Sequence, residues 1–401
     1  MQYDFNFVHI VQYKCETCVI IPTVKGLAFL TCDPINQEKI SHFYSDNLNI
    51  NAICKLRKKD CFMQHSDEML IHDNLFNFNP SSENNVLKCR ISNPVNESGC
   101  RFLLALCNNG FACILYKLND FSCSLELFTS VTEKLVSELE SRSFFEQFEM
   151  NPVEKYQRRI KMCRISDIRW TQRIENSQFL IWTVSCSGHL YVWLFSNDNG
   201  LSFLDALDYG NIEISYLDWI PTNKDQSGIL IVCLFTGQMF MYRVDYNGSK
   251  FTMDVVVSRD DADGRPCMHG SAYKTSDDEL NVLLLKQSTL ISYRWNVTKL
   301  DVAPNLQTYF HSFGVLRGLC TNNITGHTFL FDMHSDVFML EFKLGKLCLN
   351  PIPLLDKNKP KSIIKDMILS SNGMSLYILQ SNSTGFHRRK ENDSTVNPFI
   401  F

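Results

Sequence analysis

Cysteines and histidines are the residues of this sequence best suited to chemistry, so we first ask whether their spacing builds a site. Cys15 and Cys18 form a CxxC motif, one pair among 16 scattered cysteines. A redox or zinc role for such a pair requires a thioredoxin-like βαβ context or a second pair of ligands. Neither stands nearby in the sequence, so we interpret Cys15 and Cys18 as strand residues.

Other signatures of catalysis or cofactor binding are also missing from the sequence. The 10 histidines show neither HxxxH nor HExxH spacing, and there is no GxSxG, P-loop or GxGxxG motif. Asp260, Asp261 and Asp263 resemble a cation-binding loop but lack the acidic residue that ends an EF-hand loop, so we predict a mobile acidic turn there. Because no nucleophile, base and orienting group come together, we predict a protein that is not an enzyme and needs no metal or cofactor.

Three clusters of Lys and Arg are candidate contacts with phosphate or with an acidic partner. Such residues attract the DNA backbone regardless of base sequence, which raises the hypothesis of weak or indirect DNA contact. The alternative is that each cluster is a solvated charge run. The clusters are Lys55, Arg57, Lys58 and Lys59; Arg158, Arg159, Lys161 and Arg164; and Arg388, Arg389 and Lys390.

The composition narrows the class of protein. With 45% hydrophobic, 12% aromatic and only 20% charged residues, the chain can bury a large core. Its net charge of −4 argues against a dedicated nucleic-acid binder, which is usually basic. Residues 1–10 lack a basic stretch followed by an apolar core, and no apolar run reaches the roughly 18 residues that span a bilayer. We therefore predict a reducing intracellular compartment and no membrane partner.

The elements that must position any site are repeated β-hairpins. Each is an apolar strand, a turn centred on Gly or Asn, and a second apolar strand, and Asn-Gly between such runs is a strong hairpin signal. The predicted pairs of strands are Cys18–Pro22 with Leu27–Thr31, Phe102–Cys107 with Phe111–Tyr116, Phe179–Ser185 with His189–Phe195, Ile229–Leu234 with Gln238–Val244, Leu280–Leu285 with Leu290–Trp295, Thr328–Asp332 with Val337–Phe342, and Ser375–Leu379 with Gly385–Arg388.

Further strands flank several hairpins. Ile165–Trp170, Ile214–Trp219 and Ile363–Leu369 precede a hairpin, whereas Leu125–Phe128 and Asp254–Ser258 follow one as more polar outer strands. A lone four-stranded sheet leaves its apolar faces open, and radial packing of several sheets covers them. The sequence therefore predicts an all-β fold, a single seven-bladed WD40-like β-propeller domain over residues 1–401. Gly188-His189 and Trp193 are similar to the ends of WD40 repeats, although the Asp after the Trp is missing.

Two segments interrupt the repeats. Residues 35–85 form a polar insertion, and residues 131–162 contain a helical pattern, Val131–Leu139, with Thr132 as its expected N-cap. Loops carry function on a rigid scaffold, so these insertions are candidates for specific contacts.

Three stretches, 87–117, 163–195 and 214–244, resemble in order and spacing the propeller of the tau60 family of transcription factor IIIC subunits, whose animal counterpart is the delta subunit. Residues 365–386 (KDMILSSNGMSLYILQSNSTGF) are similar to that family's last blade. Members continue into a further C-terminal domain, which this chain would lack.

The resemblance implies a nuclear scaffold that helps to recruit RNA polymerase III to promoter DNA. The implied partners are other transcription factor IIIC subunits, above all a second, tau91-like propeller, together with TATA-binding protein. Two alternatives stay open. One is an adaptor in another complex, for example in ubiquitin ligation, ribosome assembly or membrane coats. The other is a lysine acetyltransferase acting on histones, an activity attributed to the animal counterpart, but the sequence lacks its acetyl-CoA-binding glycine loop.

Overall fold

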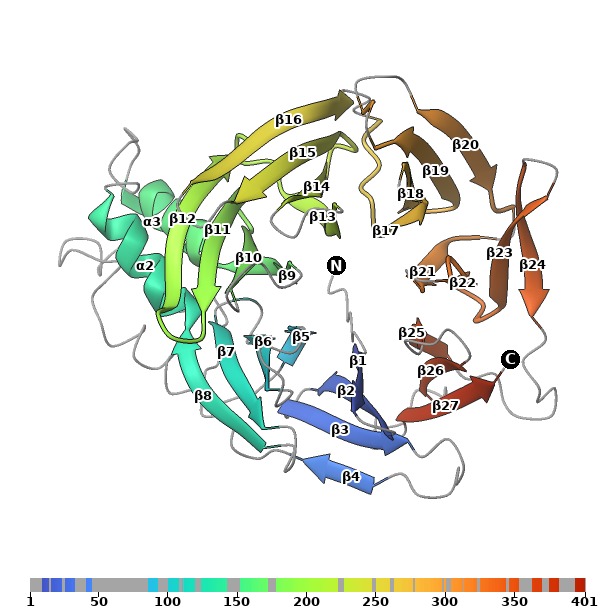
Figure 1. Ribbon diagram of the computed structural model, residues 1–401, viewed down its shortest axis with the longest axis horizontal. Helices are drawn as coiled ribbons and strands as arrows, with labels where there is room; N and C mark the ends of the chain where they lie inside the picture. The colour runs from blue at the N-terminus through green and yellow to red at the C-terminus, as the bar shows by residue number, and fades with distance from the viewer. Residues whose placement is uncertain are drawn as a thin grey trace. The chain divides into compact units, whose positions relative to one another are not determined.

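The computed structural model of the chain consists mainly of antiparallel strands (Figure 1). For strands before residue 45 and for residues 394–400 it describes the backbone only. It describes residues 9–13, 16–23, 26–32, 41–44, 86–92, 100–107, 110, 112–119, 124–142, 152–171, 178–222, 227–246, 250–259, 263–276, 278–297, 299–300, 304–312, 314–322, 325–343, 346–352, 363–369, 375–381 and 394–400.

The chain divides into two compact units. Unit 1 comprises Met1–His9 and Ile20–Ile214, and unit 2 comprises Ile10–Val19 and Ser215–Phe401. The first strands, β1 (His9–Tyr13) and β2 (Glu16–Thr23), fall at this division.

Unit 1 contains two four-stranded sheets, each antiparallel and in chain order, and a β3–β4 pair. Helices α2 and α3 lie side by side against strands of both four-stranded sheets (Figure 1). The elements are β3 (Gly26–Cys32), β4 (Ser41–Tyr44), β5 (Val86–Ile91), β6 (Arg101–Cys107), β7 (Ala112–Asn119), β8 (Ser124–Ser130), α2 (Val131–Ser141), α3 (Pro152–Cys163), β9 (Ile165–Trp170), β10 (Gln178–Ser185), β11 (His189–Ser196) and β12 (Gly200–Asp208).

The core of unit 1 lies between its two four-stranded sheets. Phe102 of β6 meets Phe195 of β11 edge-on, with ring centroids 4.6 Å apart. Leu135 and Leu139 turn the apolar face of α2 into the same cluster, because residues four apart share one side of a helix. The helical insertion is therefore part of the fold of unit 1.

Unit 2 repeats the same meander. Its elements are β13 (Ile214–Pro221), β14 (Ser227–Leu234), β15 (Met239–Tyr246), β16 (Phe251–Arg259), β17 (His269–Ser276), β18 (Glu279–Lys286), β19 (Thr289–Asn296), β20 (Asn305–Phe310), β21 (Leu316–Thr321), β22 (Thr328–Asp332), β23 (Val337–Lys343), β24 (Lys346–Ile352), β25 (Ile363–Leu369), β26 (Ser375–Ser381) and β27 (Ser394–Ile400). The sheets are β13–β16, β17–β20, β21–β24 and the three-stranded β25–β27.

Three apolar clusters fill the spaces between consecutive sheets of unit 2. The first includes Ile231 and Leu284, the second includes Leu283 and Leu330, and the third joins β22 and β23 to β25 and β26. The central strands are buried over nearly their whole length, for example β18, since each sheet is covered on both faces.

The predicted all-β class and the strands of the first six hairpins are confirmed, as are the flanking strands. Two details were wrong. The strand that pairs with β26 is Ser394–Ile400, whereas the predicted Gly385–Arg388 lies outside the described residues. The N-cap of α2 is Ser130, whose Oγ accepts the Glu133 N–H at 3.2 Å, because Thr132 already lies in the helix and accepts the Cys113 N–H.

Only β4 is described within the predicted insertion 35–85. Among the helices that the structure describes, none has the length and apolar character needed to span a membrane.

Candidate interaction surface

In unit 2, tight turns and the connections between sheets lie together and form what we call the turn rim. The turns join the second and third strands of the three four-stranded sheets of unit 2, at residues 235–237, 287–288 and 333–336. The connections are residues 263–268, between β16 and β17, and 311–315, between β20 and β21.

Hydrogen bonds donated by main-chain N–H groups fix these segments to one another. Donors in one segment reach acceptors in the next, so the rim is continuous through unit 2 and its turns are held in place. The bonds run from Gly264 N–H to Thr236 O (2.9 Å), Leu316 N–H to Gln287 O (3.2 Å), Met333 N–H to Val315 O (2.9 Å) and Ile364 N–H to Ser335 Oγ (2.9 Å).

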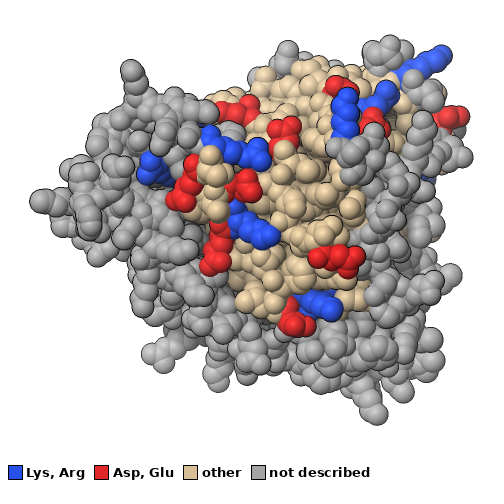
Figure 2. Space-filling view, turned by 60° about the vertical axis from the view of Figure 1, so that its left-hand side comes forward, with Lys and Arg blue, Asp and Glu red and all other residues tan. Residues whose placement is uncertain are grey.

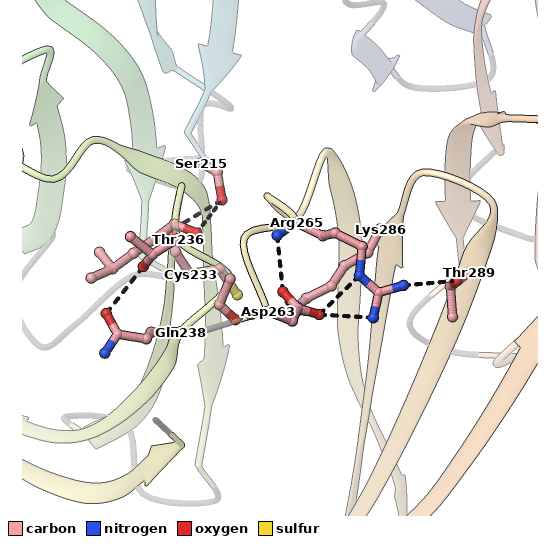
Figure 3. Close-up of polar contacts among 10 residues, drawn as sticks. Ser215, Cys233, Thr236, Gln238, Asp263, Arg265, Lys286 and Thr289 are labelled. Carbon is pink, nitrogen blue, oxygen red and sulfur yellow. Dashed lines mark hydrogen bonds and ion pairs between the residues drawn. The ribbon is translucent and has the colours of Figure 1, made fainter. Parts of the chain in front are cut away.

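A buried lysine strengthens one of these junctions (Figure 3). Lys286, only 4% exposed, donates from Nζ to the Gly237 carbonyl at 2.9 Å, and its Nζ lies 3.3 Å from both Asp263 carboxylate oxygens. Arg265 also binds Asp263, at 3.0 Å, and reaches Thr289 Oγ1 at 3.5 Å. We call Asp263, Arg265 and Lys286 the latch, because they join turn 235–237 to the neighbouring sheet.

The latch keeps Asp263 ionised. Partial burial alone would raise the pKa of this carboxyl, but the Arg265 N–H and the Lys286 ammonium lower it below its usual value. Our prediction of a mobile acidic turn was therefore wrong for Asp263, because the turn is anchored by a buried cation. Asp260 and Asp261 lie outside the described residues.

A histidine–aspartate pair supports the next junction. His311 and Asp332 are both buried, with Nε2 and Oδ2 3.4 Å apart. The other carboxylate oxygen of Asp332 accepts the N–H groups of His334 (2.9 Å) and Asp336 (3.0 Å). Turn 333–336 is therefore preorganised by its own aspartate.

Apolar side chains lie exposed on this fixed rim. Phe235 and Met333 stand on turns, Val315 stands on a connection, and Ile363 begins β25 next to Ser335. Exposed apolar side chains on rigid turns are suited to burial against another protein, because little further ordering is needed on binding.

In unit 1 the corresponding turn, residues 186–188, contains a hydrogen-bonded chain of side chains. Ser185 Oγ lies 2.9 Å from Ser187 Oγ, which lies 2.8 Å from His189 Nδ1. His189 Nε2 stands 3.6 Å from an Asp208 carboxylate oxygen. The order serine, histidine, aspartate is that of a hydrolase triad.

Burial indicates that this series of hydrogen bonds is structural. The side chain of Ser187 is buried, with the residue only 2% exposed, and Ser185 Oγ accepts the His189 backbone N–H at 3.1 Å. Burial lowers the pKa of His189, outweighing the raising effect of Asp208, so the neutral ring is favoured. Trp193 Nε1 donates to Thr183 Oγ1 at 3.0 Å, which links the central strands of the same sheet.

The second predicted basic cluster lies at the end of α3 beside this turn. The Arg164 carbonyl accepts the Cys186 N–H at 2.8 Å, which fixes the helix end to turn 186–188. Arg158 and Lys161 are three residues apart and share one helix face, and Lys161 is exposed. Arg159 and Arg164 are half-buried. The four residues thus lie in the last turns of α3 and directly after it.

The other predicted contacts are not located. Lys55, Arg57, Lys58, Lys59, Arg388, Arg389 and Lys390 lie outside the described residues, as does Cys15, and the side chain of Cys18 is not described. On the face in Figure 2, basic and acidic side chains are interspersed over the residues shown in colour. In the part of the chain that the structure describes, no three His, Cys, Asp or Glu side chains gather as metal ligands.

The sequence did not reveal Lys286, nor the exposed Phe235, Val315 and Met333 of the rim. A cation at the end of the apolar run in β18, next to a tight turn, is the signal that could have found Lys286. Its partner Asp263 is 23 residues away, so no local spacing connects the two.

Comparisons with known proteins show the fold. No protein-family model matches the chain, and no curated protein matches it. The crystal structure of the mitotic checkpoint complex contains a similar chain, with 10% identity and a TM-score of 0.53 over 100% of this chain and 88% of that one. The structure of U3-55K is similar too, with 11% identity and a TM-score of 0.51 over 100% and 97% of the two chains.

Both similar structures are WD40 β-propellers, and the repeated four-stranded meanders agree with them, so the chain has a WD40-like propeller fold. The number of blades stays a prediction. Because 1214 chains of solved structures match, the fold alone does not select one function.

Proposed function

We propose that this protein is a non-enzymatic scaffold of a multiprotein complex and that the turn rim of unit 2 contacts a protein partner. The observation that carries the proposal is the exposure of Phe235, Met333, Val315 and Ile363 on or beside rim segments that hydrogen bonds and the latch hold in place. One of the two similar solved structures is of a complex, the mitotic checkpoint complex, which agrees with such a role.

Physical chemistry favours binding over catalysis at this rim. Its buried polar side chains, such as Lys286 and Asp332, support turns, and its exposed side chains combine the apolar Phe235, Val315 and Met333 with polar ones such as Arg265 and His334. Burying such side chains against a partner yields roughly 25 cal/mol per Å² of apolar surface before the costs of association. A preformed rim lowers those costs.

The test compares three tagged proteins: the unaltered chain, a rim variant and a control variant. Each is first used to capture partners from cell extracts, and its affinity for the captured partner is then measured with recombinant protein. We expect the unaltered chain to copurify a stoichiometric partner, and Val315→Asp with Met333→Asp to weaken that binding at least about tenfold. The matched control is Val255→Asp, which places the same charge at an exposed apolar position of β16. Equal binding by the rim variant and the control, with unchanged melting temperatures, would refute the rim as the contact surface.

A finer proposal concerns the complex itself. The resemblance of residues 87–117, 163–195 and 214–244 supports a nuclear subunit of transcription factor IIIC, with a tau91-like propeller and TATA-binding protein as partners. The grouping of Arg158, Arg159, Lys161 and Arg164 at the end of α3 agrees with a weak contact to a DNA backbone or an acidic protein.

Copurification tests this identity. Transcription factor IIIC subunits should be the most enriched proteins bound to the tagged chain. Lys161→Glu should weaken DNA association in a salt-dependent way, whereas Lys134→Glu on α2, whose Nζ binds the Leu201 carbonyl, serves as the control. Enrichment of another assembly without any transcription factor IIIC subunit would keep the scaffold and reject this identity.

A further inference from the structure

Strand β20 is the outer strand of the sheet β17–β20, and its exposed residues differ in kind from those of the outer strands β8, β12, β16 and β24. It is the last strand in the order β17-β18-β19-β20, and among the described strands only β19 pairs with it (Figure 1). The β19–β20 register runs from Arg294 opposite Asn305 to Thr289 opposite Phe310 without a shift. A regular antiparallel ladder of this kind fixes which backbone groups point outward.

The hydrogen bond just beyond the ladder sets its phase. The His311 N–H donates to the Ser288 carbonyl at 2.8 Å, so these two residues form a hydrogen-bonded pair. Pairs alternate in an antiparallel ladder, so Phe310, Thr308 and Leu306 occupy the non-hydrogen-bonded positions. Their N–H and C=O groups therefore point away from β19, toward the open edge.

The same three residues expose their side chains. Exposure alternates along β20, with Gln307 and Tyr309 turned inward, while Leu306 is 47% and Phe310 70% exposed. Leu306 and Phe310 thus combine outward-pointing backbone groups with exposed apolar side chains. A strand added to this edge would hydrogen-bond to the backbone and cover both side chains as cross-strand neighbours.

Natural sheet edges usually carry charges or proline that prevent such pairing. Among the outer strands whose side chains the structure describes, the others follow this rule, including β8 with its exposed Glu126. β12 exposes Asp205 and Asp208, β16 exposes Asp254, and β24 exposes Lys346 and Pro351. β20, with the sequence NLQTYF, has neither charge nor proline. Its edge is unprotected by the devices that its neighbours use.

We propose that β20 docks an extended segment of a partner protein by strand addition. The segment is uncharged over about six residues and has apolar side chains at alternate positions that face Leu306 and Phe310. An uncharged segment is the fitting partner, because β20 (NLQTYF) has no charged side chain that could pair with a charge on the segment. Arg294, which lies opposite Asn305 in the β19–β20 ladder, is paired with Glu279.

This docking site is separate from the turn rim and does not depend on it. Rim contacts use side chains on turns, whereas β20 uses backbone groups at a sheet edge. The double variant Val315→Asp with Met333→Asp should leave strand addition unchanged, so failure of either proposal is visible without the other.

The test uses a fluorescent heptapeptide of alternating valine and threonine, added to the full chain. Saturable anisotropy is expected, together with slower amide hydrogen exchange in residues 305–310. In an antiparallel added strand, valines facing Leu306 and Phe310 direct their own N–H groups to β20. N-methylation of the valine amides should therefore weaken binding at least about tenfold, and N-methylation of the threonine amides by less than about twofold.

Protein variants complete the test. Leu306→Lys with Phe310→Lys should weaken peptide binding at least about tenfold, while Val255→Lys, an exposed position on β16, should not. The proposal is overturned by absence of saturation up to about 1 mM peptide, or by equal effects of the two methylation patterns. It is also overturned if the chain sediments as a dimer that Leu306→Lys with Phe310→Lys dissociates, because the occupant is then a second copy.

Discussion

Removing either partner of the Asp263–Lys286 pair should destabilise unit 2 unequally. Lys286 is almost completely buried, whereas the side chain of Asp263 is 25% exposed. Water can therefore solvate the carboxylate left by Lys286→Met, but it reaches poorly the ammonium left by Asp263→Ala. The expected order is that Asp263→Ala destabilises more than Lys286→Met.

The magnitudes follow from the contacts. Lys286→Met loses one hydrogen bond, to Gly237 O, worth about 1 kcal/mol, and a partly exposed ion pair worth up to about 1 kcal/mol. The total is about 2 kcal/mol. Asp263→Ala leaves a buried cation without its counter-charge, a change that costs about 3 kcal/mol at the lower end of the usual range, because Gly237 O still accepts from it.

The assay is a double-mutant cycle in urea, with the free energy of unfolding taken from the transition of unit 2. Because the double variant no longer buries a lone charge, it should be only about 2 kcal/mol less stable than the wild type, so the single effects do not add. A larger loss for Lys286→Met than for Asp263→Ala, or additive single effects, would refute the assignment of Lys286 as a buried charge held by Asp263.

Four further predictions concern the rest of the chain. Gly188 has φ 79° and no room for a Cβ, whereas Gly200 has φ 74° and open space. Gly188→Ala should therefore lower the melting temperature far more than Gly200→Ala, which carries only the left-handed backbone cost of about 1–2 kcal/mol; equal shifts would contradict the close approach. The pKa of His189 is lowered on folding, so the unfolded state binds more protons and stability should fall as pH drops below about 6.5. His189→Gln should flatten that pH profile in thermal denaturation, and an unchanged slope would reject the burial effect. Ser130→Ala should remove the cap on Glu133 and cost about 1 kcal/mol by chemical denaturation. Titration calorimetry with acetyl-CoA should show no heat of binding, and a saturable signal would revive the acetyltransferase alternative.

The strands were predictable because their signals are local. Phe179–Ser185 and Ile229–Leu234 are short apolar runs next to Gly-containing turns, and such runs specify buried strands without knowledge of distant residues. The seventh hairpin failed for the opposite reason. Its third strand, Ser394–Ile400, follows a long polar segment, and Asn397 and Pro398 within it weaken the strand pattern.

The candidate site was far less predictable than the fold. Charge runs such as residues 55–59 attract attention in a sequence, yet the charged residues that shape the rim are single. Asp263 and Lys286 form an ion pair only because the fold of β17 and β18 brings them together. Likewise, the exposure of Phe310 depends on its position in the β19–β20 ladder, because its sequence context alone would suit a buried strand equally well.

Buried polar side chains support the turns of different sheets with different residues, which agrees with a recognisable fold in a sequence that matches no family model. Each sheet must immobilise the turn between its second and third strands, but different residues do so. A buried serine–histidine chain supports turn 186–188, Asp263 with Lys286 supports turn 235–237, and His311 with Asp332 supports turn 333–336. The shared feature is a buried polar group that hydrogen-bonds beside the turn, and several side-chain combinations supply it. Support of a turn therefore does not by itself require one fixed repeat signature in the sequence.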